Sequence, residues 1–220
     1  PNVNVKMAEV VSADPTALAV RLNDGQEIAG SHLVLAAGSQ PNFFHTPGAD
    51  QHAFPLYSLQ DAERLHSRIL TLFEDADRDP ALVEKGALNF VVVGAGATGT
   101  EVAGALAEMI RDVMPSEYHD LAIQRAKVTL VDAGDAVLGP FSPNAHAYAS
   151  KALERDGVEI RLGASVKEIG PGHATLSDGT TIPTRCVIWG GGLMAGPLAE
   201  NSGNAHGRGG RIHVLPALTV

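Results

Sequence analysis

Cysteine and long apolar runs are what this sequence lacks. It has one cysteine, Cys186, among 220 residues, and no run of 18 apolar residues. A single cysteine excludes a disulfide within the chain and a zinc site made of several thiolates, and it fits a reducing compartment such as the cytoplasm. Because no apolar run is long enough, the chain contains no predicted membrane-spanning helix.

Excess basic charge and metal-binding spacings are also lacking. The 16 basic residues are outnumbered by 25 acidic ones and form no basic stripe, so we expect no nucleic-acid partner. None of the nine histidines is spaced as HxxxH or HExxH. We therefore interpret them as surface or core residues and expect no metal site.

Glycine, in contrast, is plentiful, with 24 residues that often fall in turn-like places. Residues 2–37 form short segments of alternating apolar and polar positions, and Asn23-Asp24-Gly25 is a hairpin signal. This pattern predicts an antiparallel β-meander that leads into a buried strand at 33–36. Residues 38–57, rich in glycine and proline, are predicted to be a loop.

The rest of the chain alternates between predicted helices and strands. Apolar spacing predicts a helix over 59–76 with Ser58 as its N-cap, and a helix over 100–113 that Pro115 limits. The other predicted elements are strands at 88–93, 128–134 and 158–163, a helix at 144–156, a second meander around Asp178-Gly179, a strand at 186–192 and a strand near the C-terminus. This order predicts an α/β protein with a Rossmann-like βαβαβ parallel sheet.

Two distant segments share one plan. Residues 24–41, DGQEIAGSHLVLAAGSQP, and residues 178–195, DGTTIPTRCVIWGGGLMA, each suggest a hairpin, a buried strand and an exit that contains glycine. Such a loose repeat is natural in a protein with two dinucleotide-binding domains.

The strongest chemical signal is a glycine motif between the predicted strand at 88–93 and the predicted helix that follows it. Gly94 would permit the tight turn, Gly96 would let the backbone approach a pyrophosphate, and Gly99 would let the helix pack closely on the strand. Ala97 and Thr98 would then present backbone amides to the phosphates at the helix N-terminus. A strand before the motif and a helix after it are the context that makes this pattern specific.

Asp132 ends the second predicted strand of this unit. A carboxylate there accepts hydrogen bonds from ribose hydroxyls and repels a 2′-phosphate, which favours NADH over NADPH. Ala133 follows it, and no basic residue comes next. Asp132 lies 38 residues after Gly94, against about 20 in a compact unit, and the insertion 114–127 accounts for the surplus. A solvated carboxylate at a strand end is the alternative interpretation.

Three further features have two interpretations each. Glu101, placed in the first helical turn, either stabilises the helix dipole or lies near the nicotinamide. Gly190, Gly191 and Gly192 either let the backbone pass close to a ligand or form a flexible exit loop. Cys186, within a predicted buried strand, is interpreted as a small packed side chain rather than a nucleophile.

These residues carry a resemblance to a known family. The chain resembles the pyridine nucleotide-disulfide oxidoreductases, and within them the type II NADH dehydrogenases, which are flavin-dependent NADH:quinone oxidoreductases. The segments that carry the resemblance occur in the family's order: HLVLAAGSQPNFFHTPGA, FPLYSLQDAERLHSRILTLFEDA, VVVGAGATGTEVAGALAEM, VTLVDAGDAVLGPFSP, VEIRLGASVKEI, VIWGGGLMAGPL and GRIHVLPALTV. Two positions depart from it, since Ala97 stands where the family usually has proline and Asp132 where glutamate is commoner.

The resemblance implies a role for each matching position. Gly94, Gly96, Gly99 and Asp132 would hold NADH, Glu101 would lie where nicotinamide meets flavin, and Gly190–Gly192 would run along the NADH. Gly38, Ser39, Gln40 and Pro41 would approach FAD. The implied reaction is hydride transfer from NADH to FAD, followed by reduction of a quinone.

The resemblance also implies how the chain is organised. Residues 1–50 are expected to be a partial FAD-domain segment, 51–197 the NADH-binding domain with its linker helix, and 198–220 the return to the FAD domain. The flavin-binding glycine motif would precede residue 1, so we expect an internal fragment that binds NADH at most. A homodimer, and a parent protein at the inner face of the cell membrane, are compatible expectations.

Other assignments stay open from the sequence. Within the superfamily they are a ferredoxin-reductase-like flavoprotein, an apoptosis-inducing-factor-like flavoprotein and a sulfide:quinone reductase. The last is disfavoured because this stretch has no catalytic cysteine pair. From a different class, a non-catalytic NADH-sensing module is the alternative, although a sensor has no use for flavin-domain segments.

Overall fold

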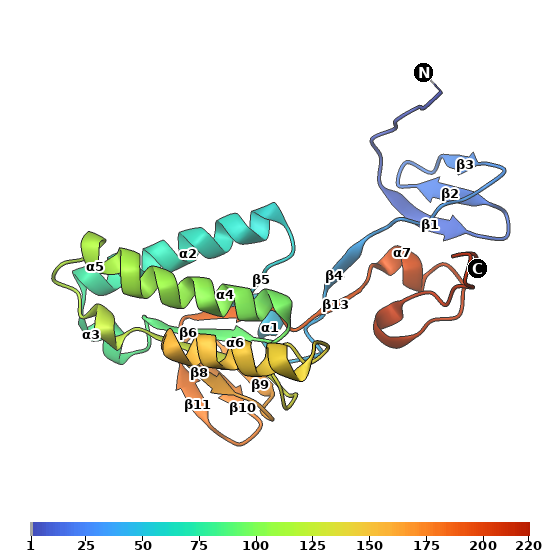
Figure 1. Cartoon of the computed structure of the whole chain (residues 1–220). Coiled ribbons are helices and arrows are strands. Elements are labelled where there is room, and N and C mark those ends of the chain that lie inside the picture. The colour runs from blue at the N-terminus through green and yellow to red at the C-terminus, as the bar shows by residue number, and fades with distance from the viewer. Residues whose placement is uncertain (1) are drawn as a thin grey trace. The chain divides into compact units, whose positions relative to one another are not determined.

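The computed structural model describes residues 2–220, which form two compact units (Figure 1). The larger unit is Phe43–Gly192, and the smaller one combines residues 2–42 with Leu193–Val220.

A five-stranded parallel sheet forms the centre of the larger unit, in the order β5-β12-β6-β7-β8. Its strands are β5 (Ala53–Pro55), β6 (Asn89–Val93), β7 (Lys127–Val131), β8 (Val158–Arg161) and β12 (Cys186–Trp189). The parallel βαβαβ sheet predicted from the sequence is confirmed, and strand β6 and its neighbours lie where the apolar runs placed them.

Both faces of this sheet are covered. Phe90 and Val92 of β6 belong to the core shared with the helices, whereas Val91 and Val93 belong to a second core shared with an antiparallel sheet. That second sheet consists of β9 (Val166–Gly170), β10 (His173–Leu176) and β11 (Thr181–Pro183). Burial on both faces explains why the central strands are continuously apolar instead of alternating.

The helices of the larger unit differ in whether a side chain caps their first turn. They are α1 (Ala49–His52), α2 (Leu59–Arg78), α3 (Ala81–Glu84), α4 (Ala97–Glu108), α5 (Met114–Glu117) and α6 (Pro143–Arg155). Ser58 caps α2, because its hydroxyl accepts a hydrogen bond from the Asp61 amide while the Asp61 carboxylate accepts one from the Ser58 amide. The predicted cap is therefore confirmed.

Two expectations for the larger unit were wrong in detail. The predicted loop 38–57 contains β5, which pairs with β12 at the sheet edge. Three residues ending in a proline are too short for a pattern to reveal, and proline is tolerated in an edge strand. The second wrong expectation was that Pro115 ends the helical region. A π-helical turn, Met109–Val113, follows α4, and Pro115 lies at the start of α5, where its missing amide hydrogen costs little.

The smaller unit has a three-stranded antiparallel meander, β1-β2-β3, as the sequence predicts. Its elements are β1 (Val10–Asp14), β2 (Ala19–Leu22), β3 (Glu27–Ala29), β4 (Ser39–Pro41), β13 (Leu193–Ala195), α7 (Pro197–Glu200) and a 3₁₀ turn, Arg208–Gly210. Gly25, with φ of 83°, makes the hairpin turn between β2 and β3.

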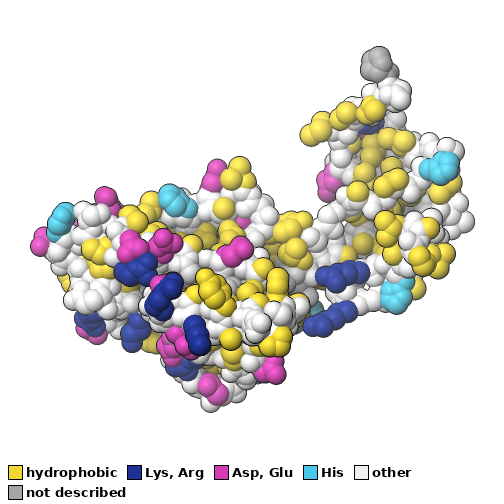
Figure 2. Space-filling view, viewed as in Figure 1, with side chains coloured by type: hydrophobic (Ala, Val, Ile, Leu, Met, Phe, Trp, Pro, Cys, Tyr) yellow, Lys and Arg dark blue, Asp and Glu magenta, His cyan; other side chains and the backbone are white. Residues whose placement is uncertain are grey.

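Two predicted strands of the smaller unit are absent from the described residues. Residues 33–36 form no strand, and the C-terminal segment 211–220 contains only a turn near 216–217 and a single bridge between Ile212 and His206. Val34 is 84% exposed. An apolar run becomes a buried strand only when neighbouring strands accept its backbone hydrogen bonds, and no strand among residues 2–220 pairs with either segment. Figure 2 shows the apolar side chains that remain at the surface of this unit.

None of the helices in residues 2–220 combines the length and apolarity needed to cross a membrane.

Candidate functional site

The candidate site lies at the carboxyl ends of the parallel strands, where the strand order reverses. β7 and β8 lie on one side of β6, and β12 and β5 on the other. In open α/β sheets, the connections leave such a point in opposite directions and open a crevice between them. Here the turn after β6 and the glycines after β12 meet at that point, because the Gly190 amide donates to the Val93 carbonyl at 2.7 Å.

Two glycines of the motif are required by the chain itself. Gly94 has φ of 100°, and a Cβ there would lie 2.5 Å from the Gly190 carbonyl oxygen. A Cβ on Gly99 would lie 1.8 Å from the Gly94 carbonyl oxygen. Because both positions lack a Cβ, the start of α4 lies directly against the glycine turn, and the turn lies against the end of β12. This is the close packing expected of the first and third glycines.

Gly96 differs from its two neighbours. A Cβ there would have no atom within 4 Å other than those of Gly96 itself and its two chain neighbours, and the φ of −72° suits any residue. Gly96 is also the N-cap of α4, which has no side-chain cap. The first residues of α4, Ala97 and Thr98, are exposed. Open space in front of uncapped helix amides fits a diphosphate, which those amides and the helix dipole would stabilise.

Asp132 lies beside this turn. Its carboxylate accepts hydrogen bonds from the amides of Ala95 and Gly134, each at 2.6 Å. The side chain is partly buried, whereas Ala133 is exposed. The carboxylate therefore faces the glycine turn and holds it against the tip of β7. Each carboxylate oxygen can accept a second hydrogen bond, so the contacts within the chain leave acceptor capacity for a ribose.

The loop after Asp132 contributes a contact that sequence reasoning missed. The Leu138 amide donates to the Ala95 carbonyl at 2.7 Å, and Leu138 has φ of 56°. Val137 beside it is fully buried. This loop is thus held against the glycine turn. The Gly139-Pro140 pair that follows marks a turn in the sequence, but nothing local reveals its contact with Ala95.

Glu101 is exposed and lies in the second turn of α4, since the helix begins at Ala97 and has no acidic residue in its first turn. The expectation that it occupies the first turn was therefore wrong, because the helix starts three residues earlier than its apolar spacing indicates. Helix-dipole stabilisation falls off beyond the first turn. The dipole interpretation of Glu101 is weakened accordingly.

The three glycines after β12 have structural reasons of their own. A Cβ on Gly191 would lie 3.0 Å from the Trp189 ring, and Gly192 has φ of 122°. Trp189 is buried and packs on Phe43 with ring centroids 5.5 Å apart. This aromatic pair was not predicted, since the two residues are distant in sequence. Gly190 and Gly191 are half-buried and Gly192 is exposed, so the backbone passes the crevice without side chains to obstruct it.

Cys186 is fully buried in β12. Burial raises the pKa of its thiol to about 12. A neutral, enclosed thiol is a poor nucleophile, which supports its interpretation as a packed side chain. Within residues 2–220, no three His, Cys, Asp or Glu side chains are grouped to hold a metal ion.

The residues expected near flavin belong to the smaller unit. Ser39–Pro41 is β4, which pairs with β13, and Gly38 before it is exposed with φ of 69°. Gln40 lies opposite Met194 in that pairing. Gly38 also lines a cavity of about 240 Å³ together with Leu35, Leu198 and Arg211.

The parallel sheet, the glycine turn against an uncapped helix and the carboxylate at the next strand's tip define a dinucleotide-binding domain of the Rossmann type. The chain matches, over residues 1–219, the family described as pyridine nucleotide-disulphide oxidoreductase. It belongs to that family.

Individual proteins that resemble the chain are more specific than the family as a whole. The chain is 37% identical, over 86% of its length, to the type II NADH:quinone oxidoreductase Ndh of Mycobacterium tuberculosis, and covers 42% of that protein. It superposes on NDH2 of Plasmodium falciparum, solved in complex with NADH, with a TM-score of 0.80 at 17% identity, covering 90% of this chain and 44% of the other. It also superposes on a ferredoxin reductase of Rhodopseudomonas palustris with a TM-score of 0.70 at 22% identity, covering 93% and 45%. The chain thus spans less than half the length of each of these proteins.

Proposed function

We propose that the crevice of the larger unit binds NADH, and that the chain is the NADH-binding part of a type II NADH:quinone oxidoreductase. The observation that carries this is Gly96, whose missing side chain leaves open space at the uncapped start of α4. A glycine kept only for packing would resemble Gly94 or Gly99, where a Cβ collides with the backbone. Family membership and the M. tuberculosis relative support the same assignment.

Each residue of the crevice has a proposed role. The amides of Ala97, Thr98 and Gly99 would bind the diphosphate, and Asp132 with Ala133 would lie at the adenosine ribose. Glu101 and the backbone of Gly190, Gly191 and Gly192 would lie along the nicotinamide half. Val93 and Trp189, which come directly before the glycines of the two turns, are buried.

The flavin contact is proposed for the smaller unit. Gly38, Ser39, Gln40 and Pro41 are the candidates, because Gly38 is exposed and lines a cavity of about 240 Å³. FAD, when bound, accepts a hydride from NADH and passes electrons to the next acceptor. That acceptor is proposed to be a quinone in the full-length protein. The division into 1–50, 51–197 and 198–220 remains our proposal for the functional segments, and so do a homodimer and attachment to the inner membrane face.

There are two competing functions, one within the same fold and one from another class. A ferredoxin-reductase-like flavoprotein is the alternative within the same fold, and the R. palustris structure has that fold. A non-catalytic NADH-sensing module is the alternative from another class. The similarity to the M. tuberculosis relative, which has the higher sequence identity of the two, favours the quinone reductase.

Full-length protein with FAD and a soluble quinone is expected to oxidise NADH, followed as a loss of absorbance at 340 nm. Omitting FAD should abolish the rate, because hydride transfer needs the flavin. A ferredoxin offered in place of the quinone is the matched acceptor control. A faster rate with ferredoxin would favour the alternative reductase, and no flavin-dependent rate with any acceptor would favour the sensor.

Asp132→Asn is expected to weaken NADH binding to the 220-residue chain about tenfold and to reduce the preference for NADH over NADPH. The side-chain nitrogen of asparagine cannot accept a hydrogen bond, so one of the two backbone amides that donate to Asp132, those of Ala95 and Gly134, would lose its acceptor. The charge that repels a 2′-phosphate would also be lost. Hydrogen bonds to charged groups contribute about 1.5–3 kcal/mol, which sets this scale. Titration followed by the fluorescence of Trp189, the sole tryptophan, gives both affinities.

The control for this substitution is Asp135→Asn, which removes an exposed carboxylate three residues along the same loop. It should leave both affinities unchanged. Equal affinity of the unsubstituted chain for NADH and NADPH would contradict the role assigned to Asp132.

A further inference from the structure

A cavity of about 620 Å³ lies in the larger unit at the end of α4 that is remote from the glycine turn. It is bounded by the last turn of α4, the π-helical turn and the segment that leads into β7. Cavities of roughly 300–1,000 Å³ are typical of sites for small organic ligands. Ala97 starts α4 at the crevice and Ala107 lines this cavity, so the two sites lie at opposite ends of one helix.

The wall of the cavity is mainly apolar and held in place by the core. The apolar lining includes Ala107, Ile110, Leu121, Ile123, Ala126 and Val128. Ala107, Leu121, Ile123 and Val128 are also members of the buried core. The insertion 114–127 supplies much of this wall. A cavity whose lining is part of the core is formed before any ligand arrives.

One side of the cavity offers an aromatic ring in a fixed position. Tyr118 lines the cavity, its ring stacks on Phe73 at 5.7 Å, and its hydroxyl donates to Glu74 at 2.8 Å. Burial and the Glu74 carboxylate raise the pKa of Tyr118 to about 12, so the ring is neutral at pH 7. A ring held on one face and at its hydroxyl is pre-organised to stack with another planar group.

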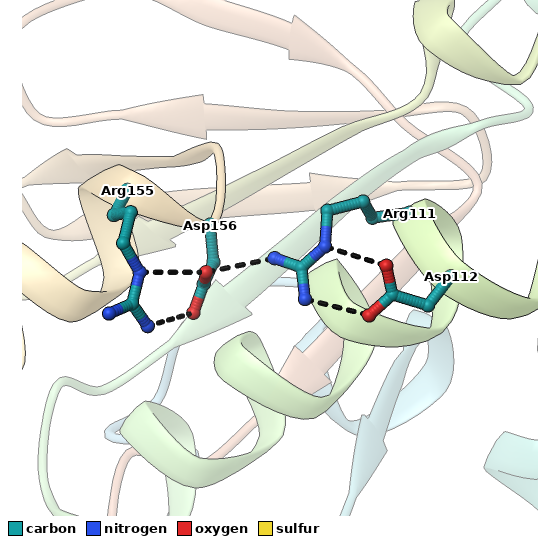
Figure 3. Close-up of polar contacts among 4 residues, drawn as sticks. All are labelled: Arg111, Asp112, Arg155 and Asp156. Carbon is teal, nitrogen blue, oxygen red and sulfur yellow. Dashed lines mark hydrogen bonds and ion pairs between the residues drawn. The ribbon is translucent and has the colours of Figure 1, made fainter.

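The rim of the cavity carries charges that compensate one another. Arg155, Asp156, Arg111 and Asp112 alternate in sign along a chain of ion pairs (Figure 3). Arg111 contacts Asp156 at 2.8 Å and Asp112 at 2.7 Å. Arg111 and Asp156 line the cavity. Because these charges are already paired, they offer a charged ligand little to offset the loss of its own hydration, which is costly, whereas a neutral ligand loses little.

The rim also provides uncharged hydrogen-bonding groups. His119 and Gln124 line the cavity from the inserted segment, and both are exposed. The Gln124 side chain can donate and accept hydrogen bonds, and a neutral imidazole has one donor nitrogen and one acceptor nitrogen. In such sites, a small number of polar groups on a mainly apolar wall orients the ligand. The π-helical turn Met109–Val113 also borders the cavity, and such turns are frequent at functional sites.

We propose that this cavity binds a small neutral aromatic molecule that carries one hydrogen-bonding group. The aromatic body would stack near Tyr118 against the apolar wall, and its polar group would reach His119 or Gln124 at the rim. Because the nucleotide crevice lies at the other end of α4, both sites can be filled at once. The proposal does not depend on which nucleotide or acceptor the protein uses.

The test is a titration of the 220-residue chain with 2-naphthol at pH 7, followed by amide shifts in nuclear magnetic resonance spectra. Saturable shifts are expected at Ala107, Ile110, Leu121, Ile123 and Val128, and they should persist with saturating NADH. Naphthalene-2-sulfonate, which has the same rings and a charge, should bind at least about tenfold more weakly, a difference of about 1.4 kcal/mol.

Three outcomes would overturn the proposal. Shifts that do not saturate or that map elsewhere would show that the cavity is not a site. Displacement of 2-naphthol by NADH would place it in the nucleotide crevice. Equal binding of the sulfonate would contradict a neutral ligand. A separate NADH titration of the same sample reports on the nucleotide site, so its failure is distinguishable from each of these.

Two variants localise the site independently. Ala126→Phe fills the cavity and should weaken 2-naphthol binding at least tenfold, whereas Ala147→Phe, on the exposed side of α6, should not. NADH affinity should be unchanged in both. If Ala126→Phe does not fold, it is replaced by Gln124→Trp, which obstructs the exposed rim. The same loss of 2-naphthol affinity is expected. Unchanged 2-naphthol affinity in a folded cavity variant would overturn the proposal.

Discussion

Gly99→Ala is expected to destabilise the protein by about 2 kcal/mol or more, although alanine is the better helix former by about 1 kcal/mol. The reason is steric, since the new Cβ would lie 1.8 Å from the Gly94 carbonyl oxygen. Backbone cannot rotate away as a side chain can, so either α4 or the turn must shift. Overpacking in a closely packed region typically costs about 1–3 kcal/mol, and occasionally more.

Gly104→Ala provides the matched control on the same helix. Its Cβ would meet only a methyl group of Leu153 at 3.7 Å, an ordinary contact. This substitution should therefore stabilise the protein by about 0.5–1 kcal/mol, because glycine is unfavourable inside a helix. Urea unfolding of the three proteins gives the comparison. If Gly99→Ala were as stable as Gly104→Ala, the close approach of α4 to the turn would be disproved.

Gly96→Val is expected to leave the fold intact and to weaken NADH binding about 100-fold or more. Apart from its own residue and its two chain neighbours, no atom lies within 4 Å of the new Cβ, so the branched side chain would occupy space proposed for the diphosphate. A poorer N-cap should cost less than about 1 kcal/mol of stability. A 100-fold loss of affinity corresponds to about 2.8 kcal/mol. Urea unfolding and fluorescence titration measure the two effects separately.

Gly172→Val is the control for this experiment. Gly172 lies in the exposed turn between β9 and β10, and a Cβ there would also have no neighbour within 4 Å. NADH affinity should be unchanged in that variant. A Gly96→Val protein that binds NADH as tightly as the unsubstituted chain would remove the observation on which the proposed function rests.

Much of the site could be predicted because its signals are local. The strand before Gly94 and the helix after it are adjacent in sequence, so the turn between them follows from one apolar run and one helical spacing. The position of Asp132 follows in the same way, since it directly succeeds β7. The two hydrogen bonds that hold its carboxylate at the glycine turn come from Ala95 and Gly134. The bond from Ala95, 37 residues away, depends on how β6 and β7 pair.

Contacts between distant segments were what sequence reasoning missed. The Phe43–Trp189 pair and the Leu138–Ala95 hydrogen bond join residues remote in the chain, and the larger cavity brings Asp156 and Gly157 to residues 107–128. The start of α4 was missed for a different reason. Ala97 and Thr98 are exposed and do not belong to the helical spacing of apolar residues. That spacing therefore predicts the helix only from the point where its buried face begins.

Residues 24–41 and 178–195 show which features depend on the local sequence and which depend on the tertiary structure. Local pattern alone determined that both segments carry a turn glycine after an aspartate, at Gly25 and Gly179, where φ is 83° and 85°. It also determined an apolar run after each hairpin. The tertiary structure alone decided that Cys186–Trp189 becomes a central strand, paired with β5 and β6, while 33–36 does not form a strand. A turn needs only the φ that its own residues can adopt, whereas a strand exists only where neighbouring backbones complete its hydrogen bonds.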